Sequence, residues 1–422
     1  MRRLLFTLIF LMTACTATPA TITPLSPPTT ASSPEPTVPP IARPFPQHVL
    51  YAPNSILPNY RTQTQLDDDV RAYYDIWKAD YVVEAGMNAD DLMMYRVAFG
   101  KDEPAHSTTV SEGQGYGMMI TPVMAGYDPQ AREIFDGMWA FVDAHRSEID
   151  ARLMDWNVPR KEGNASAFDG DADIAFGLLL ADAQWGSTGR VNYKAEAGTM
   201  IAGILESTIG SESHLPMLGD WVNVGDSQYN QFTPRSSDFM LVNFRAFGRA
   251  VKDPVWEDVV SQSQILMVAM QEQYSPDAGL MPDFIVNGAP APANFLEKDT
   301  DGAYNYNAGR VPWRVGADAL LNDDSISHGI VQNISHWIEI SAEGNPHNIR
   351  AGYKLNGEPL PNSNYFTTFF VAPMGVAAMN DPAQQEWLNN VYDAVYDTHL
   401  DYYEDSVDLL CLMIMSGNFW SP

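Results

Sequence analysis

A carboxylate among glycines stands at residue 112, in the run from Ser111 to Met118 (SEGQGYGM). Small residues let a backbone or a ligand approach closely, and the apolar residues that follow predict the start of a helix in a partly dry place. Desolvation there would raise the pKa of Glu112, as a general acid requires. The alternative is a helix-terminal carboxylate that only complements the helix dipole.

Three carboxylates follow each other closely in the run from Asp169 to Asp173 (DGDAD), directly before an apolar segment from Ile174 to Trp185. That segment is apolar on nearly all sides, which is typical of a helix buried in the middle of a large domain. We therefore expect Asp169 or Asp171 in an interior site with hydrogen-bond partners. Helix capping could occupy one of the three carboxylates, but hardly all of them.

A third cluster, residues 297–314, mixes carboxylates with aromatic residues and two arginines. Tyr and Trp faces stack on sugar rings, while Arg and Asn orient hydroxyl groups and water. The alternative is a solvated loop with a few packed aromatic side chains. The chain has 10 Trp, 19 Tyr and 18 Phe, many of them in such loops. An aromatic-lined cleft with a few acidic groups suits a neutral polysaccharide.

Charge and motifs exclude several classes of protein. The 24 basic and 53 acidic residues give a formal net charge of −29. A nucleic-acid binder needs a basic face, and an anionic membrane surface is disfavoured as a partner for the same reason. The chain has no HExxH helix, no G-x-S-x-G elbow and no P-loop, and its eight histidines are scattered. We expect no metal, no cofactor and a monomer.

Helical patterns dominate the chain. Apolar residues recur at helical spacing within 134–142, 254–274 and 381–396, and the segment 407–415, which contains Cys411, is apolar on nearly all sides. Alternating strand patterns are scarce, and long loops occupy 215–238 and 286–315. The patterns predict an all-α domain with elaborate loops at one end.

The first residues predict export. Two arginines precede an apolar run from Leu4 to Met12, which is typical of a signal peptide over residues 1–14. The run from Leu11 to Cys15 resembles a bacterial lipobox, so we expect lipidation at Cys15, with plain secretion as the alternative. Residues 15–46 are rich in Pro, Thr and Ser and predict an extended linker. We expect a bacterial cell-surface lipoprotein or secreted protein, with a catalytic domain over 47–422.

Four blocks together resemble the family 8 glycoside hydrolases. They are the run at 111–118, the run at 167–185, residues 306–314 (YNAGRVPWR), and the C-terminal block 402–418, in the order of that family. The resemblance implies an (α/α)6 barrel with a cleft formed by long loops at one end. It implies an inverting endo-hydrolase of β-1,4-linked polysaccharide, with Glu112 as the general acid. Asp169 would bind the sugar at the cleavage point, and Asp171 is the second choice.

The general base differs from that of many members. Where they carry Asp in the Tyr-Asp-x-x-Arg block, this chain has Asn307, which cannot accept a proton near neutral pH. The chain resembles instead the subfamily with chitosanases and lichenases, in which a Glu from an inserted loop takes over. Residues 292–297 resemble that loop, which makes Glu297 the expected base, with Asp299 and Asp301 as rivals. Asn307 and Arg310 would position the water or the sugar.

The sequence is compatible with more than one polysaccharide substrate. The resemblance allows a β-glucan such as lichenan or cellulose, or chitosan; a xylan or xylooligosaccharide hydrolase and an inactive carbohydrate-binding lipoprotein are the alternatives. Candidate sugar platforms are Trp156, Trp221, Trp313, Tyr306, Tyr402 and Tyr403.

Overall fold

The computed structural model describes residues 41–159 and 164–422. The predicted signal peptide, Cys15 and most of the predicted linker lie outside the described residues. Residues 42–45, which the composition assigned to the linker, lie on the helical domain. The Phe45 N–H donates to the Ala125 carbonyl at 2.7 Å, and the ring is 6% exposed. One aromatic anchor therefore starts the folded unit inside a proline-rich stretch whose average composition conceals it.

Twelve α-helices and three short antiparallel strand pairs make up the regular structure of the described residues. The helices are α1 (Gln63–Tyr81), α2 (Ser111–Val123), α3 (Ala131–Ala144), α4 (Phe168–Trp185), α5 (Tyr193–Thr208), α6 (Leu241–Val251), α7 (Val255–Tyr274), α8 (Val311–Asn322), α9 (Ser325–Ser341), α10 (Ala372–Ala378), α11 (Gln385–Val395) and α12 (Tyr402–Met415). The pairs are β1 (Val82–Met87) with β2 (Met93–Val97), β3 (Thr109–Val110) with β4 (Asn157–Val158), and β5 (Ile285–Val286) with β6 (Ala289–Pro290).

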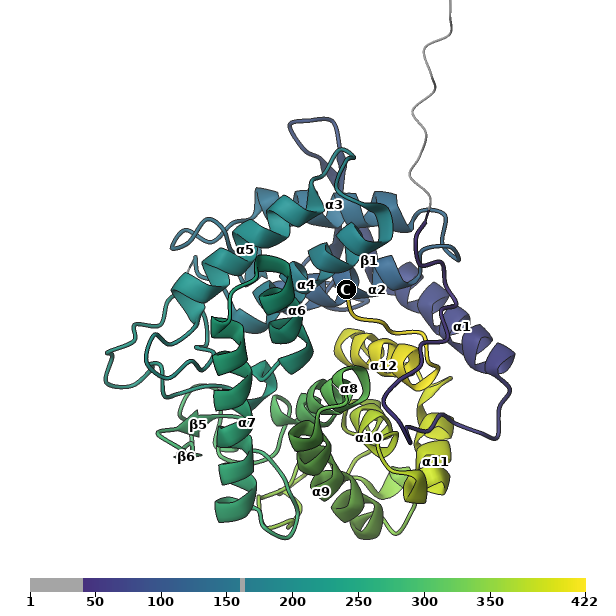
Figure 1. Cartoon of the computed structure of the whole chain (residues 1–422), viewed down its shortest axis with the longest axis vertical. Coiled ribbons are helices and arrows are strands. Elements are labelled where there is room, and N and C mark those ends of the chain that lie inside the picture. Colours follow the sequence, from purple (N-terminus) through teal and green to yellow (C-terminus); the bar gives the residue numbers. More distant parts are fainter. Residues whose placement is uncertain (1–40, 160–163) are drawn as a thin grey trace, which may run out of the picture. The chain divides into compact units, whose positions relative to one another are not determined.

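The helices form two concentric rings, as Figure 1 shows. The even-numbered helices α2, α4, α6, α8, α10 and α12 contact one another in a closed cycle, and the odd-numbered helices surround them. This arrangement confirms the expected (α/α)6 barrel. The inner helices α4 and α12 are buried on nearly all sides, as their continuous apolar runs predict.

Outer helices bury one face only. In α3 the apolar residues at helical spacing, from Ile134 to Val142, are buried, whereas Glu133 and Asp143 are not. The predicted stripes in α7 and α11 are confirmed in the same way, and Asp381 caps the 3-10 turn that leads into α11. Each fully buried large aliphatic side chain contributes roughly 1.5–3 kcal/mol to folding, so the closed ring can be stable without a disulfide. Cys411 is a buried free thiol in α12.

Glycines bring the first turns of α2 and α4 together. A Cβ on Gly115 would lie 2.7 Å from the Cβ of Asp173, and a Cβ on Gly170 would lie 2.6 Å from the backbone carbon of Ser111. Real Cβ atoms do not approach so closely, so only glycine permits this spacing. The close approach sets the residues next to Ser111 and Gly170, namely Glu112 and Asp169, on facing turns.

Within the described residues, no helix combines the length and the apolar character that crossing a bilayer would need.

We expect Gly115→Ala to lower the free energy of unfolding by about 1–3 kcal/mol, because the new methyl group would force α2 and α4 apart. Gly198→Ala in α5 is the matched control: no atom lies within 4 Å of the added Cβ, so helix propensity should raise stability by up to about 1 kcal/mol. Urea unfolding followed by circular dichroism measures both. Equal stability of Gly115→Ala and the wild type would contradict the packing argument.

Candidate active site

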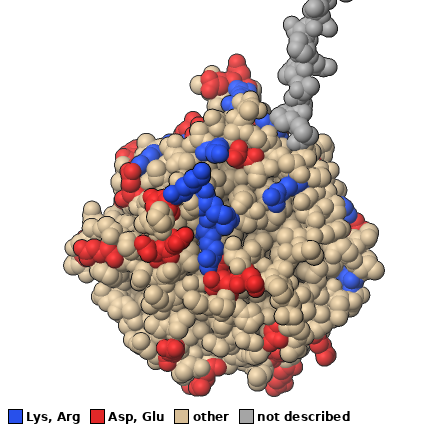
Figure 2. Space-filling model, in the orientation of Figure 1, with Lys and Arg blue, Asp and Glu red and all other residues tan. Residues whose placement is uncertain are grey.

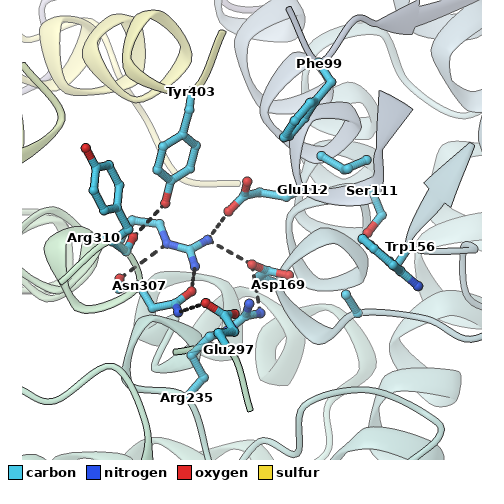
Figure 3. A pocket seen from close by; sticks show the side chains of 13 residues that line it. Phe99, Ser111, Glu112, Trp156, Asp169, Arg235, Glu297, Asn307, Arg310 and Tyr403 are labelled. Carbon is cyan, nitrogen blue, oxygen red and sulfur yellow. Dashed lines mark hydrogen bonds and ion pairs between the residues drawn. The ribbon is translucent and has the colours of Figure 1, made fainter. Parts of the chain in front are cut away.

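A pocket of about 410 Å³ opens where the first turns of α2, α4 and α12 meet the turn before α8. Figure 3 shows its side chains. Its lining residues are Phe99, Val110, Ser111, Glu112, Trp156, Ala167, Asp169, Arg235, Glu297, Tyr306, Asn307, Arg310 and Tyr403. Carboxyl groups, guanidinium groups and aromatic rings thus converge on one space at the amino-terminal ends of the inner helices.

Arg310 lies at the centre of these contacts, in the 3-10 turn η2 (Ala308–Arg310) that leads into α8. Its side chain is only 1% exposed. One terminal nitrogen, Nη1, contacts both Glu112 and Asp169, the latter at 2.8 Å. The other, Nη2, donates to the Ser237 hydroxyl at 2.9 Å and to the Asn307 side-chain oxygen at 3.1 Å. The buried charge is therefore paired and hydrogen-bonded, as burial requires.

Glu112 stands in the first turn of α2, as predicted, with a side chain that is 18% exposed. Burial raises the pKa of this carboxyl group; the Arg310 guanidinium opposes the rise, and the negative charge of Asp169 adds to it. The Tyr402 hydroxyl donates to Glu112 Oε2 at 3.3 Å. The arrangement favours a carboxyl group that keeps its proton.

Asp169 is the opposite case. Burial would raise the pKa of Asp169, but the guanidinium groups of Arg235 and Arg310 outweigh burial and hold that pKa well below its usual range. Arg235 Nη2 lies 2.8 Å from Asp169 Oδ2, and the Gly170 N–H donates to Oδ1 at 3.0 Å. The pKa values of two neighbouring carboxyl groups are therefore shifted in opposite directions, and the contacts of Asp169 favour its ionised form.

Glu297 reaches the pocket from an exposed loop. The Asn307 side-chain nitrogen donates to Glu297 Oε2 at 3.1 Å, while the oxygen of the same amide accepts from Arg310. An amide can donate and accept at once, which a carboxylate at this position could not do. Asn307 thus links the buried guanidinium to the exposed carboxylate (Figure 3).

The rival carboxylates in this loop have other surroundings. Asp301 is fully buried and accepts the backbone N–H groups of Leu296, Glu297 and Lys298 at 2.7, 3.0 and 3.0 Å. It therefore fixes the turn that carries Glu297. Asp299 is exposed and does not line the pocket.

Four sequence candidates do not line the pocket. Asp171 is buried, and its Oδ1 accepts the Met154 N–H at 2.9 Å, because a position two residues from Asp169 faces another side of the helix. Trp221 packs on Tyr229 with ring centroids 5.3 Å apart. Trp313 is a core residue, and Tyr402 lies behind Glu112 rather than beside the open space. Tyr306, Tyr403 and Trp156 do line the pocket.

Several residues of the site carry no recognisable sequence motif. Arg235 lines the pocket just before the 3-10 turn η1 (Ser236–Asp238), and its Nε lies 3.0 Å from Asp238. Burial raises the pKa of Asp238 to about 7. Asp283 is buried and accepts the backbone N–H groups of Asn305, Asn307 and Ala308. Arg235 stands in a polar loop run (TPRSSD) and Asp283 is a single acidic residue within an apolar run; both patterns are too common to indicate a site.

No group of three or more potential ligands among the described His, Cys, Asp and Glu residues could hold a metal ion. The pocket carboxylates contact guanidinium and amide groups, and carboxyl groups held in this way can give and accept protons.

Comparison with known proteins identifies the family. The family model for glycosyl hydrolases family 8 matches residues 55–417. The chain is 39% identical over 388 residues to a beta-glucanase of Niallia circulans, covering 90% of this chain and 91% of that protein. It is 37% identical over 396 residues to an endoglucanase of Bacillus sp. (strain KSM-330), covering 90% and 82%.

A solved structure agrees over the same length. The apo beta-1,3-1,4-glucanase from Paenibacillus sp. X4 superposes with a TM-score of 0.85 at 39% sequence identity, covering 90% of this chain and all of that one. The chain therefore belongs to glycosyl hydrolases family 8 and is a glycoside hydrolase.

Proposed function

We propose that this chain is an inverting endo-hydrolase of β-1,4-linked glucan, with Glu112 as general acid and Glu297 as general base. The observation that carries the proposal is the contact chain from Glu112 through Arg310 and Asn307 to Glu297, which joins a buried and an exposed carboxyl group across one pocket. An inverting mechanism needs two such groups in different surroundings.

Glu112 supplies the proton. Burial raises the pKa of Glu112, so the group stays protonated to higher pH than a solvent-exposed glutamate. The proton passes to the glycosidic oxygen as the bond to the anomeric carbon breaks. Activity is lost as the pH rises through the pKa of Glu112, because the ionised group has no proton to give.

Glu297 accepts a proton from water on the other face of the sugar. The attacking water forms a bond to the anomeric carbon as the glycosidic bond breaks, which inverts the configuration at that carbon. An inverting pair is generally about 6.5–9.5 Å apart, which leaves room for the water. Asp169, held ionised, balances the positive charge that develops on the sugar ring.

A neutral glucan fits the charges of the pocket better than cationic chitosan does. The pocket holds three carboxyl groups and two guanidinium groups; when Glu112 is protonated, the remaining charges balance. The net charge of −29 therefore does not extend into the pocket. On the face shown in Figure 2, acidic residues form separate groups, and Lys and Arg side chains gather over α6. The names of the two glucanase relatives and the endoglucanase relative support the same substrate class.

Export remains part of the proposal. A polymeric glucan is met outside the cell, and the signal-like residues 1–14 with Cys15 support a secreted or lipid-anchored enzyme.

The substrate is tested by reducing-end release from lichenan, carboxymethylcellulose, chitosan and xylan, with Glu112→Gln as the blank. We expect lichenan or carboxymethylcellulose to be degraded fastest, with viscosity falling ahead of reducing-end release, as for internal cleavage. Chitosan or xylan as the best substrate would overturn the glucan assignment. No release above the blank from any of the four polymers would contradict the proposal that this chain hydrolyses glucan.

We expect Glu112→Gln and Glu297→Gln each to lower kcat roughly 100- to 10,000-fold, the range for loss of a general acid or base. Glucan binding should persist, because both changes keep the shape of the side chain. Asp299→Asn, an exposed change in the same loop, is the matched control and should stay near wild-type activity. NMR of the first product should show the α-anomer; a β-anomer would rule out inversion.

Asp301→Asn should lower kcat/KM roughly 10- to 100-fold while Asp299→Asn does not. The amide cannot accept all three N–H groups that Asp301 now holds, and each lost hydrogen bond to a charged group costs about 1.5–3 kcal/mol. Lichenan hydrolysis and a thermal melt of each variant measure the effect. The reverse pattern, with Asp299→Asn inactive, would remove Glu297 from the role of base.

A further inference from the structure

Two carboxyl groups in the pocket share a single guanidinium nitrogen. Arg310 Nη1 contacts both Glu112 and Asp169. Carboxyl groups this close do not readily ionise together, and one of them tends to retain a proton. Arg310 alone does not determine which of the two that is, because it contacts both.

A second guanidinium group breaks this symmetry. Arg235 Nη2 lies 2.8 Å from Asp169 Oδ2, and Arg235 forms no ion pair with Glu112 among the described residues. Its charge lowers the pKa of Glu112 as well, but there its effect is smaller than that of Arg310, whereas for Asp169 the charge of Arg235 lowers the pKa more than the charge of Arg310 does. The side chain is 14% exposed and lines the pocket. Its other acidic partner is Asp238, at 3.0 Å. Since the pKa of Asp238 is raised to about 7, Asp238 is largely neutral at acidic pH, and Asp169 is then the charged partner of Arg235.

We propose that Arg235 is a positioning residue that assigns the proton in this pair: by binding Asp169 and not Glu112, it keeps Asp169 ionised and leaves the proton on Glu112. The inference rests on the proposed role of Glu112 as general acid. Without Arg235, the proton would be divided between the two carboxyl groups. Whenever it sat on Asp169, the acid would lack its proton and the sugar would lack its counter-charge.

Other charged and titratable groups around Asp169 do not offer the same selectivity. Asp173 follows on α4 but is paired with Arg314, and Tyr402 and Tyr403 on α12 have pKa values raised by burial, so they stay neutral. The groups that surround Asp169 are Glu112 from α2, Asp173 from α4, Arg235 and Asp238 from the η1 region, Arg310 from η2, Tyr402 and Tyr403 from α12, and Glu297, near Arg235, from its loop.

The test compares Arg235→Gln with Arg235→Lys on two substrates. Lichenan needs a proton on its leaving group, whereas a dinitrophenyl β-cello-oligosaccharide does not, because its leaving group departs as a stable anion. We expect Arg235→Gln to lower kcat/KM on lichenan roughly 10- to 100-fold, which corresponds to a change of about one or two units in the pKa difference between Glu112 and Asp169. The fold-loss on the aryl glycoside should be at least about tenfold smaller than the fold-loss on lichenan. In the pH–activity profile of Arg235→Gln, the fall in activity on the acidic side should move to higher pH, because Asp169 takes up a proton more easily without Arg235. Arg235→Lys, which keeps the charge, should restore most of both properties.

Arg245→Gln is the matched control. Arg245 also bridges two aspartates, Asp318 and Asp324, at 2.8 Å each, outside the pocket. It should lower the melting temperature without changing the substrate ratio or the pH profile. If Arg235→Gln slows both substrates equally, or Arg235→Lys fails to restore the ratio, the inference is wrong. If Arg235→Gln does not fold, Arg235→Lys decides: a substrate ratio and a pH profile close to those of the wild type support the inference, and a ratio shifted toward the aryl glycoside despite the retained charge opposes it.

Failure of the proposed function gives a different result. Glu112→Gln should show the same dependence on the leaving group, only larger. If it does not, Glu112 is not the acid; if it does and Arg235→Gln does not, only the role of Arg235 is lost.

Discussion

A guanidinium group removed from water must have its charge neutralised and its N–H groups bonded, since an uncompensated buried charge costs several kcal/mol. Arg310 meets that requirement with partners from four separate parts of the chain: Glu112 on α2, Asp169 on α4, Ser237 in η1, and Asn307 beside it. These segments are brought together at one end of the barrel by a single buried cation. Glu112 is the proposed acid and Asp169 is the carboxylate proposed to bind the sugar, so the groups that neutralise Arg310 are also those proposed to do the chemistry.

A second buried ion pair lies one helical turn further along α4 and α8. Asp169 and Asp173 lie four residues apart on α4, and Arg310 and Arg314 have the same spacing at the start of α8, so the two ion pairs stack on one helical face. Arg314 also lies over the Trp313 ring at 4.0 Å. The second pair lies below the pocket and ties α4 to α8. Glycines at 115 and 170 then let α2 pack closely enough on α4 for Glu112 to reach Arg310.

Sequence alone predicted the helical class, the inner and outer helix patterns, and the pocket positions of Glu112, Asp169 and Glu297. Those residues lie in runs whose spacing and neighbours are informative. It did not place Asp171 away from the pocket, because three carboxylates in one run look equivalent until the helical phase is known. It did not predict that Trp221 packs on Tyr229 outside this pocket, because an aromatic residue in a loop has the same appearance whether it faces a cavity or another ring. Arg235 was not found, since its partner Asp169 is 66 residues away and only the fold brings the two together.

Asn307 explains how the proposed acid and the proposed base can stand on different kinds of structure. An aspartate in its place would put a further carboxylate beside Arg310, which already contacts Glu112 and Asp169, and it could not donate to Glu297. The amide accepts from the cation on one side and donates to the carboxylate on the other. With Asn at position 307, the second carboxylate of the pair is that of Glu297, which comes from a loop and not from the barrel wall. Asp301 holds the backbone of this loop by accepting three N–H groups. The proposed acid, Glu112, then lies within the helical ring, and the proposed base, Glu297, lies on a solvent-exposed turn. Changes in that loop can therefore alter Glu297 and its side of the pocket while leaving the buried pair of Arg310 with Asp169 intact.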